Sequence, residues 1–331
     1  MMRHLSFVVL VLFLASCQSP RPSYTQLEGN AQGTTFRIVY ADSLSRDFSV
    51  SVDSIFHVID RSMSLWDSTS VISLINANRS GIRADTHFTN VFRRAWEVSG
   101  QTDGNFDCTV GPLVKAWGFS YKKKGPPPND AQVDSLLRLA GYRRVSLEGR
   151  VVNKPPETEI DFNAIAQGYT VDVLAEFLHS KSIHNYLIEV GGEVRTMGRN
   201  ERGKTWRIGI DKPMENVEAG RPLQAVVSLK NKSLATSGSY RKFVERGGQR
   251  FSHAIDPRTG FPITHNLLSI SVVADDCMTA DAYATAFLVM GLEKAIPLAK
   301  EKGLEIYGIS AGKDNTFEVY QSAGFGAEAV E

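Results

Sequence analysis

The feature that most limits the fold of this 331-residue chain is a series of strand-like segments joined by short turns. Glycine pairs at Gly191-Gly192 and Gly247-Gly248 separate neighbouring segments. Such turns favour antiparallel pairing, because parallel strands need a long crossover connection. The segments predicted to be strands are 34–40, 144–147, 159–162, 186–190, 206–210, 223–229, 251–255, 268–273, 304–309 and 317–320.

Helical patterns lie between these segments. Asn129 is placed to cap a helix that carries Val133, and Gly141 is expected to end it. No repeat and no clear linker interrupts the chain, which predicts one α+β domain with mostly antiparallel sheets flanked by helices. Apolar residues at three- and four-residue spacing predict helices at 47–63, 71–75, 88–96, 133–137, 164–179 and 278–290.

The N-terminus has the pattern of an export signal. Arg3 precedes an apolar run from Leu5 to Leu14, which is too short to span a bilayer and is typical of a secretory signal. The run ends in LASC, which resembles a bacterial lipobox, in which the Cys is lipidated and the signal is cut before it. Lipidation of Cys17 is therefore expected, and an ordinary signal followed by a chance Cys is the alternative.

These patterns divide the chain into four segments. They are a signal peptide at 1–16, a lipidated Cys with a tether at 17–27, a catalytic domain at 28–322 and a tail at 323–331. The mature protein is expected on the periplasmic side, anchored by lipid to the inner or outer membrane. Gln18 is not the Asp that retains some lipoproteins in the inner membrane, which is a weak indication of the outer membrane.

Charge and cysteine content exclude several classes. Lys and Arg number 37 against 36 Asp and Glu, and no basic stripe indicates a nucleic-acid partner. The three Cys are too few for a disulfide framework, and no CxxC or Cys/His cluster indicates zinc. Whether Cys108 and Cys277 form a disulfide is left open.

Two polar residues interrupt the apolar helix predicted at 278–290. Asp281 and Thr285 are four residues apart and therefore lie on the same face. A buried carboxylate needs a partner or a metal. Backbone N–H groups near the helix N-terminus are one candidate partner, and a hard cation such as Mg²⁺, which prefers oxygen ligands, is the other. The spacing alone favours neither.

The segment at 159–172 predicts a strand that ends at Asp161 and a helix that begins near Ala164. Asp161 or Asn163 would cap that helix in a purely structural reading. In a functional reading, the turn exposes backbone groups to a ligand, and Gly168 permits close approach.

The remaining candidates lie in loops. His253 is either a structural histidine in a strand or a general base. Trp66 either stacks on a planar ligand or seals the core, which is commoner. The polar segment at 234–243 could bind phosphate and is also typical of an ordinary loop, and the segment at 105–112 is a further candidate. No Walker A loop, GxGxxG, GxSxG or HExxH is present, which argues against Rossmann dehydrogenases and α/β-hydrolases.

Taken together and in order, the motifs resemble those of the ApbE-type family of FAD:protein FMN transferases, over nearly all of the mature chain. The motifs are GTTF at 33–36, SLWD at 64–67, SLIN at 73–76, FDCTVGPLV at 106–114, DFNAIAQGY at 161–169, EVGGE at 189–193, ATSGSY at 235–240, HAIDPRTG at 253–260 and TADAYATA at 279–286.

The resemblance implies an ApbE-like single catalytic domain that uses Mg²⁺ and takes FAD as its substrate. Such enzymes attach FMN through a phosphoester to a Thr of a redox protein and release AMP. Typical acceptors are subunits of membrane electron-transfer complexes. Two other activities remain open, namely an Mg²⁺-dependent FAD pyrophosphatase that yields FMN and AMP, and a non-enzymatic lipoprotein that stores FAD. A surface lipoprotein with a structural Asp–Thr pair is the third alternative.

The resemblance also assigns roles by position. The metal ligands would be Asp281, Thr285 and the backbone carbonyl of Ala164. The catalytic residues would be His253, which takes the Thr proton, and Asp281, which acts through the metal. The FAD contacts would be Trp66, Asn105, Phe106, Asp107, Asp161, Gln167 and His253.

The chain departs from the usual family pattern at two positions. Where DLGGIAKG is common, this chain has DFNAIAQG, so Asn163 replaces a Gly and Gln167 replaces a Lys. The second replacement puts a direct Lys contact with the ligand in question, although Gln still forms hydrogen bonds.

Overall fold

The computed structural model describes residues 23–119, 126–214, 222–240, 243–246 and 249–330. Most helices fall where the apolar spacing predicts them, and α4 and α8 are additional. The helices are α1 (Ser49–Met63), α2 (Val71–Asn76), α3 (Thr86–Gln101), α4 (Gly111–Ala116), α5 (Asp130–Leu137), α6 (Ala166–Ser180), α7 (Cys277–Met290) and α8 (Leu292–Lys302), with short 3-10 turns at Tyr142–Arg144 and Lys313–Asn315.

An eight-stranded sheet forms the centre of the molecule, in the order β1-β2-β5-β6-β9-β12-β13-β14. Every neighbouring pair in it is antiparallel, so the predicted α+β class is confirmed. Its strands are β1 (Ser23–Ala31), β2 (Thr34–Asp42), β5 (Tyr186–Val190), β6 (Glu193–Met197), β9 (Ser233–Gly238), β12 (Leu267–Ala274), β13 (Glu305–Ala311) and β14 (Phe317–Gln321).

Three smaller sheets are present in the described part of the chain. One has the order β15-β8-β7, and the others are two-stranded hairpins, β3-β4 and β10-β11. Their strands are β3 (Ser146–Glu148), β4 (Val151–Asn153), β7 (Trp206–Asp211), β8 (Leu223–Leu229), β10 (Phe243–Arg246), β11 (Gln249–Ser252) and β15 (Ala327–Ala329).

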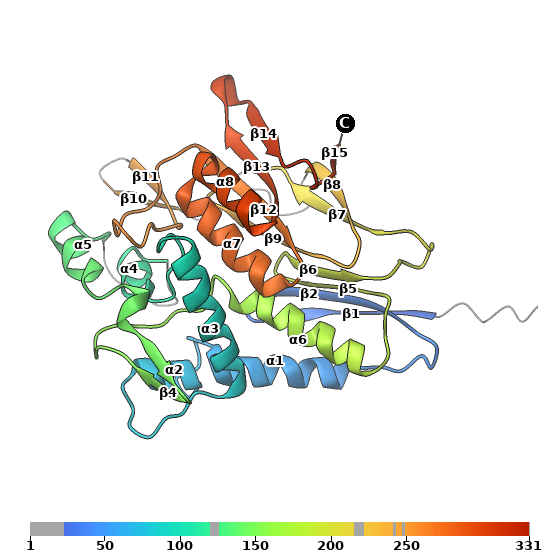
Figure 1. Cartoon of the computed structure of the whole chain (residues 1–331), viewed down its shortest axis with the longest axis horizontal. Helices are drawn as coiled ribbons and strands as arrows, with labels where there is room; N and C mark the ends of the chain where they lie inside the picture. Colours follow the sequence, from blue (N-terminus) through green and yellow to red (C-terminus); the bar gives the residue numbers. More distant parts are fainter. Residues whose placement is uncertain (1–22, 120–125, 215–221, 241–242, 247–248, 331) are drawn as a thin grey trace, which may run out of the picture.

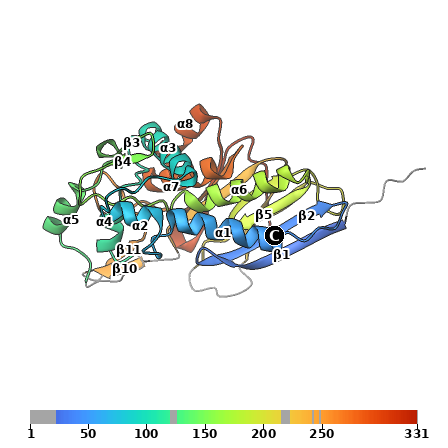
Figure 2. The ribbon, with the colours of Figure 1, turned by 90° about the horizontal axis from the view of Figure 1, so that it is seen from below.

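Helices cover the central sheet. α7 packs on β9 and β12, and α6 packs on β5, β6 and α7. α1 lies beside α6 and also contacts α2 and α3 (Figures 1 and 2), and its Phe56 packs against Phe36 of β2 with 4.9 Å between ring centroids. The largest apolar cluster of the described residues includes Phe88, Phe162 and Phe287, all of which are fully buried. The N-terminal turns of α6 and α7 consequently meet inside the molecule.

Three boundaries differ from the prediction. Residues 23–27, expected in the tether, are part of β1, which pairs along its whole length with β2. The tail contains β15, which pairs with β8. The segment 159–162 belongs to no sheet. Paired strands of the described residues thus reach beyond both predicted ends of the domain.

Other predicted elements also shift. The segment at 144–147 divides into a 3-10 turn and β3, and the strand predicted at 251–255 ends at Ser252, followed by an isolated bridge between Ile255 and Pro262. Cys108 and Cys277 are both buried and free, so no disulfide joins them. Cys17 and the predicted signal lie outside the described residues. No helix in the described ranges has the length and hydropathy of a membrane span.

Candidate functional site

Asp281 lies where α7 crosses the first turn of α6. Its Oδ2 accepts a hydrogen bond from the backbone N–H of Gly168 at 3.0 Å. A Cβ atom at position 168 would lie 2.4 Å from the Cys277 carbonyl oxygen and 2.8 Å from the Asp281 Cβ. Glycine is therefore required at this crossing, because any side chain would separate the carboxylate from the amide.

This hydrogen bond satisfies a backbone group at the start of α6. Gly168 is the third residue of the helix, where the amide has no acceptor within the helix, because the N-cap residue is Ile165. Asp281 supplies that acceptor, and no backbone amide of the described residues donates to the carbonyl of Ala164, which precedes the helix. The Ala164 carbonyl thus keeps its lone pairs for another ligand.

Thr285 lies one turn further along α7, as its spacing from Asp281 predicts. Its Oγ1 is 3.2 Å from the Oγ of Ser237 on β9. On the same strand, Thr236 Oγ1 is 2.7 Å from Ser271 Oγ on β12. Ser237 therefore contributes a hydroxyl group beside α7, whereas the side chain of Thr236, the preceding residue of the strand, points to the opposite face of the sheet.

The environment of Asp281 disfavours an uncompensated charge. The side chain is 6% exposed, and no Lys or Arg of the described residues forms an ion pair with it. Burial raises the pKa of Asp281 to about 7, the Gly168 hydrogen bond opposes that rise, and the nearby Asp172 carboxylate adds to it. A bound cation would supply the compensating charge.

The donors around Asp281 fit a hard cation. They comprise one carboxylate, one hydroxyl and one backbone carbonyl, all of them oxygen ligands of the kind that Mg²⁺ prefers. No group of three or more His, Cys, Asp or Glu in the described ranges could hold a metal. The residues present therefore fit magnesium, with water and substrate oxygens completing its shell, and do not fit zinc.

Three motifs meet beside the start of α6. A Cβ at Gly191, in the β5–β6 turn, would lie 2.9 Å from Gln167 Nε2 and 3.0 Å from Thr34 Cγ2. Gln167 therefore lies between the β5–β6 turn and the β1–β2 hairpin. Its amide group lies where the resemblance expects a cationic side chain, but it brings no charge.

The segment at 159–162, before α6, is held by side-chain and loop contacts rather than by a neighbouring strand. Asn76 donates from Nδ2 to the Ile160 carbonyl and accepts the Ile160 amide at Oδ1, both at 2.8 Å. The Asp161 amide donates to the Cys108 carbonyl at 2.8 Å. These bonds explain why the predicted strand at 159–162 is absent, since Asn76 supplies the bonds that a neighbouring strand would give.

Asp161 and Asn163 do not cap α6. The N-cap residue is Ile165, without a side-chain bond, and Asp161 Oδ1 instead accepts the Asn163 amide at 2.8 Å. Burial raises the pKa of Asp161 above its ordinary value. The partly buried carboxylate thus shapes the turn that leads to Ala164.

In the loop at 105–107, one side chain has an atom available to a ligand, and the other two side chains have structural roles. Asn105 is 4% exposed, and its Oδ1 has no hydrogen-bond partner among the described residues. Asp107 is fully engaged, because Oδ1 accepts from Thr109 and Oδ2 accepts the Tyr142 amide at 2.8 Å. Phe106 is buried in the core. Asn105 is consequently the residue of this loop with an acceptor left for a ligand.

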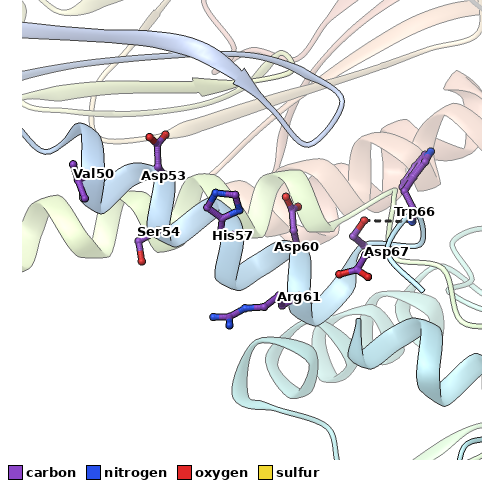
Figure 3. A pocket seen from close by; sticks show the side chains of 9 residues that line it. Val50, Asp53, Ser54, His57, Asp60, Arg61, Trp66 and Asp67 are labelled. Carbon is purple, nitrogen blue, oxygen red and sulfur yellow. Dashed lines mark hydrogen bonds between the residues drawn. The ribbon is translucent and has the colours of Figure 1, made fainter. Parts of the chain in front are cut away.

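Trp66 is 64% exposed, so it does not seal the core. It lies just beyond the end of α1, at one end of an open groove of about 830 Å³ (Figure 3). Asp53, His57 and Asp60 line the groove along α1. An exposed indole beside a groove provides a surface on which a planar ring can stack.

The groove is tied to the β1–β2 hairpin and to α6. Gln32, at the hairpin turn, lies near Asp60 of the groove and opposes the rise that burial causes in the pKa of that carboxyl. Gln32 Nε2 donates to Thr170 Oγ1 on α6 at 3.0 Å. One side chain thus lies between the groove and the first turns of α6, and no sequence pattern had singled it out.

His253 is positioned by a different part of the fold. It follows β11, and its half-buried ring packs edge-on against Phe119, with 6.1 Å between ring centroids. The turn after it passes close to Gly104, because a Cβ at that position would lie 4.0 Å from Arg258 Cγ. His253 is therefore positioned by Phe119 and belongs to neither α6 nor α7.

Known proteins resemble this chain over most of its length. The model of the ApbE family matches residues 32–307. An FAD:protein FMN transferase of Vibrio cholerae serotype O1 is 34% identical over 95% of this chain and 95% of the relative. One from Haemophilus influenzae is 35% identical over 96% of this chain and 95% of the relative.

A solved structure has the same fold. "Flavin Transferase ApbE from Vibrio cholerae" matches with a TM-score of 0.82 and 33% identity, over 92% of this chain and 98% of that chain.

Proposed function

This chain belongs to the ApbE family, and we propose that it is an Mg²⁺-dependent FAD:protein FMN transferase that attaches FMN to a Thr of an acceptor protein and releases AMP. The observation that carries the proposal is the buried Asp281 carboxylate at the crossing of α6 and α7, and two further oxygens support it, the Thr285 hydroxyl one turn along α7 and the Ala164 carbonyl, to which no described backbone amide donates. Bound there, Mg²⁺ would neutralise charge on the FAD pyrophosphate and make the phosphorus next to riboflavin more electrophilic.

The transfer is one displacement at phosphorus. The acceptor Thr oxygen forms a bond to the phosphorus that carries riboflavin, and the bridging P–O bond breaks. The bond's electron pair leaves with AMP, and the Thr proton passes to a base. Positioning and charge neutralisation contribute most to phosphoryl transfer, so the chain's main task is to hold the substrates in line.

Named residues support the positioning. Trp66 offers an exposed face for the isoalloxazine ring, and the unpartnered Oδ1 of Asn105 can accept from an amino or hydroxyl group of FAD. His253 is our candidate for the base, since its imidazole can accept the Thr proton near neutral pH. Asp281 contributes through the metal rather than by direct proton transfer.

The acceptor and the cellular location are part of the proposal. We place the enzyme on the periplasmic side, with Cys17 lipidated and the domain held at the membrane. The acceptors are then redox subunits of membrane electron-transfer complexes that expose a target Thr.

Product analysis tests this function. The full chain is incubated with FAD, Mg²⁺ and an acceptor domain, with the same domain carrying a Thr→Val change as control. The transferase account predicts that the acceptor gains FMN by mass and that one AMP is released for each FMN attached, with no gain on the control. Free FMN and AMP without acceptor would instead identify a pyrophosphatase, and unchanged bound FAD a storage protein.

A further inference from the structure

A second carboxylate, that of Asp172, also joins α6 to α7. Asp172, on α6, accepts the Cys277 amide at Oδ1 (2.9 Å) and the Met278 amide at Oδ2 (2.8 Å). These amides belong to the first turn of α7, where backbone N–H groups lack partners within the helix. One carboxylate of α6 thus caps the neighbouring helix.

The two helices bind each other reciprocally. Asp172 of α6 binds the N-terminal amides of α7, while Asp281 of α7 binds the Gly168 amide in the first turn of α6. Gly168 and Asp172 are four residues apart and lie on one face of α6. Their common face is therefore fixed against α7 at two points, one of which is the carboxylate of the proposed metal site.

The position of Asp172 is fixed in turn by β6. Arg195, on β6, forms an ion pair with Asp172 Oδ1. Asp172 is buried, so this pair is shielded from water, and its loss would leave an uncompensated charge in the interior. The chain Arg195–Asp172–Cys277 thereby connects the central sheet to the N-terminus of α7.

Asp276 caps the same helix end by a purely local bond. Its Oδ1 accepts the Thr279 amide at 2.8 Å, three residues further along the same segment. Asp172 and Asp276 together satisfy the first three amides of α7, but Asp172 alone connects them to α6. Loss of the Asp276 carboxylate should therefore affect only the capping of α7, whereas loss of the Asp172 carboxylate should also affect the position of α7 relative to α6.

We propose that Asp172 is a positioning residue, which holds α7 against α6 so that Asp281, Thr285 and the Ala164 carbonyl can bind one cation. The cation in this proposal rests on the function proposed above, whereas the position of α7 relative to α6 can be measured without any metal. Residues that orient metal ligands without touching the metal commonly change metal affinity or activity by 10–100-fold when they are replaced.

The test compares Asp172→Asn with Asp276→Asn. Both changes remove one negative charge at the same helix end, and Asn keeps one acceptor oxygen and caps as well as Asp. Mn²⁺ binding is followed by electron paramagnetic resonance, with and without FAD, as a stand-in for Mg²⁺. We expect Asp172→Asn to weaken Mn²⁺ binding by about tenfold or more and Asp276→Asn by less than about threefold. Equal effects of the two variants, or none for Asp172→Asn, would overturn the proposal.

Hydrogen exchange gives a readout that does not depend on the metal. In Asp172→Asn, the amides of Cys277 and Met278 should exchange faster, and so should that of Gly168, because α7 is no longer fixed against α6. Unchanged exchange at Gly168 would contradict the proposal. If the wild-type protein binds no Mn²⁺ in either condition, the metal assignment fails, and exchange at Gly168 still decides whether Asp172 places α7.

Arg195→Gln keeps the test open if Asp172→Asn does not fold. This change removes the ion pair but leaves both amide hydrogen bonds of Asp172. The Mn²⁺ affinity and the Gly168 exchange rate of Arg195→Gln should therefore lie between the wild-type values and the values expected for Asp172→Asn. A folded Arg195→Gln protein that equals the wild type in both measurements would count against the proposal.

Discussion

The backbone amide of Gly168 donates its hydrogen to the carboxylate of Asp281 across 3.0 Å, and no side chain fits between the two helices at that point. No backbone amide of the described residues donates to the Ala164 carbonyl, which precedes α6. The proposed function depends on this carbonyl and the buried Asp281 carboxylate binding one cation.

Gly168→Ala should damage the site and the fold together. The new methyl group would lie 2.4 Å from the Cys277 carbonyl oxygen, so α6 and α7 must move apart. We expect a loss of about 1–3 kcal/mol in the free energy of unfolding, as for other overpacked cores. Urea denaturation measures it. Gly100→Ala in α3 is the matched control, because its methyl group would have 3.8 Å to the nearest atom and should leave stability unchanged or raise it.

Thr285→Val should weaken metal binding while keeping the side-chain volume. It removes the hydroxyl that lies 3.2 Å from Ser237 and faces the proposed site. We expect the Mg²⁺ concentration for half-maximal activity to rise by about tenfold. Thr285→Ser keeps the hydroxyl and should remain within about threefold of the wild type. Similar Mg²⁺ requirements for the Val and Ser variants would exclude the hydroxyl as a ligand.

Asn105→Ala should weaken FAD binding more than it weakens the fold. Asn105 Oδ1 has no hydrogen-bond partner among the described residues. The change would therefore remove one hydrogen bond to FAD, which corresponds to a loss of about 2–10-fold in affinity. Fluorescence titration with FAD measures the change. Asp107→Asn, two residues away, should mainly lower stability, because one oxygen of Asp107 accepts from Thr109 and the other accepts the Tyr142 amide. The reverse pattern would assign the ligand contact to Asp107.

Acid should destabilise the domain partly through Asp42. Arg46 holds the pKa of Asp42 down at about 2, mainly by a side-chain hydrogen bond, from an ordinary value of 3.8. Because the folded pKa is depressed, this stabilisation is present above about pH 4 and is lost as the pH falls towards 2. The Tm of the Asp42→Asn variant should accordingly decrease less between pH 4.5 and 2.5 than the Tm of the wild type, because the variant has no carboxyl group to protonate at this position. Parallel curves would refute this contribution.

The sequence predicted the site best where its partners are close in the chain. Four-residue spacing placed Asp281 and Thr285 on one face of a buried helix, and the structure confirms both positions. It could not identify Gly168 as the partner of Asp281, because the two are 113 residues apart and no local pattern encodes their contact. Asp172 was overlooked for the same reason, since its amide partners are more than 100 residues away.

The errors in the fold have a similar origin. The segment 159–162 has the composition of a strand, but the bonds that hold it come from the Asn76 side chain and a loop carbonyl. The polar segment at 23–27 was assigned to a tether, because only its pairing with β2 makes it a strand. α8 contains Pro297, which ordinarily disfavours a helix interior.

The central claim is that Asp281 acts in FMN transfer by holding the metal. Asp281→Ala should abolish transfer of FMN to the acceptor at saturating FAD and Mg²⁺, while circular dichroism and thermal unfolding show an intact fold. Full transfer activity of a folded Asp281→Ala protein with Mg²⁺ present would contradict the claim.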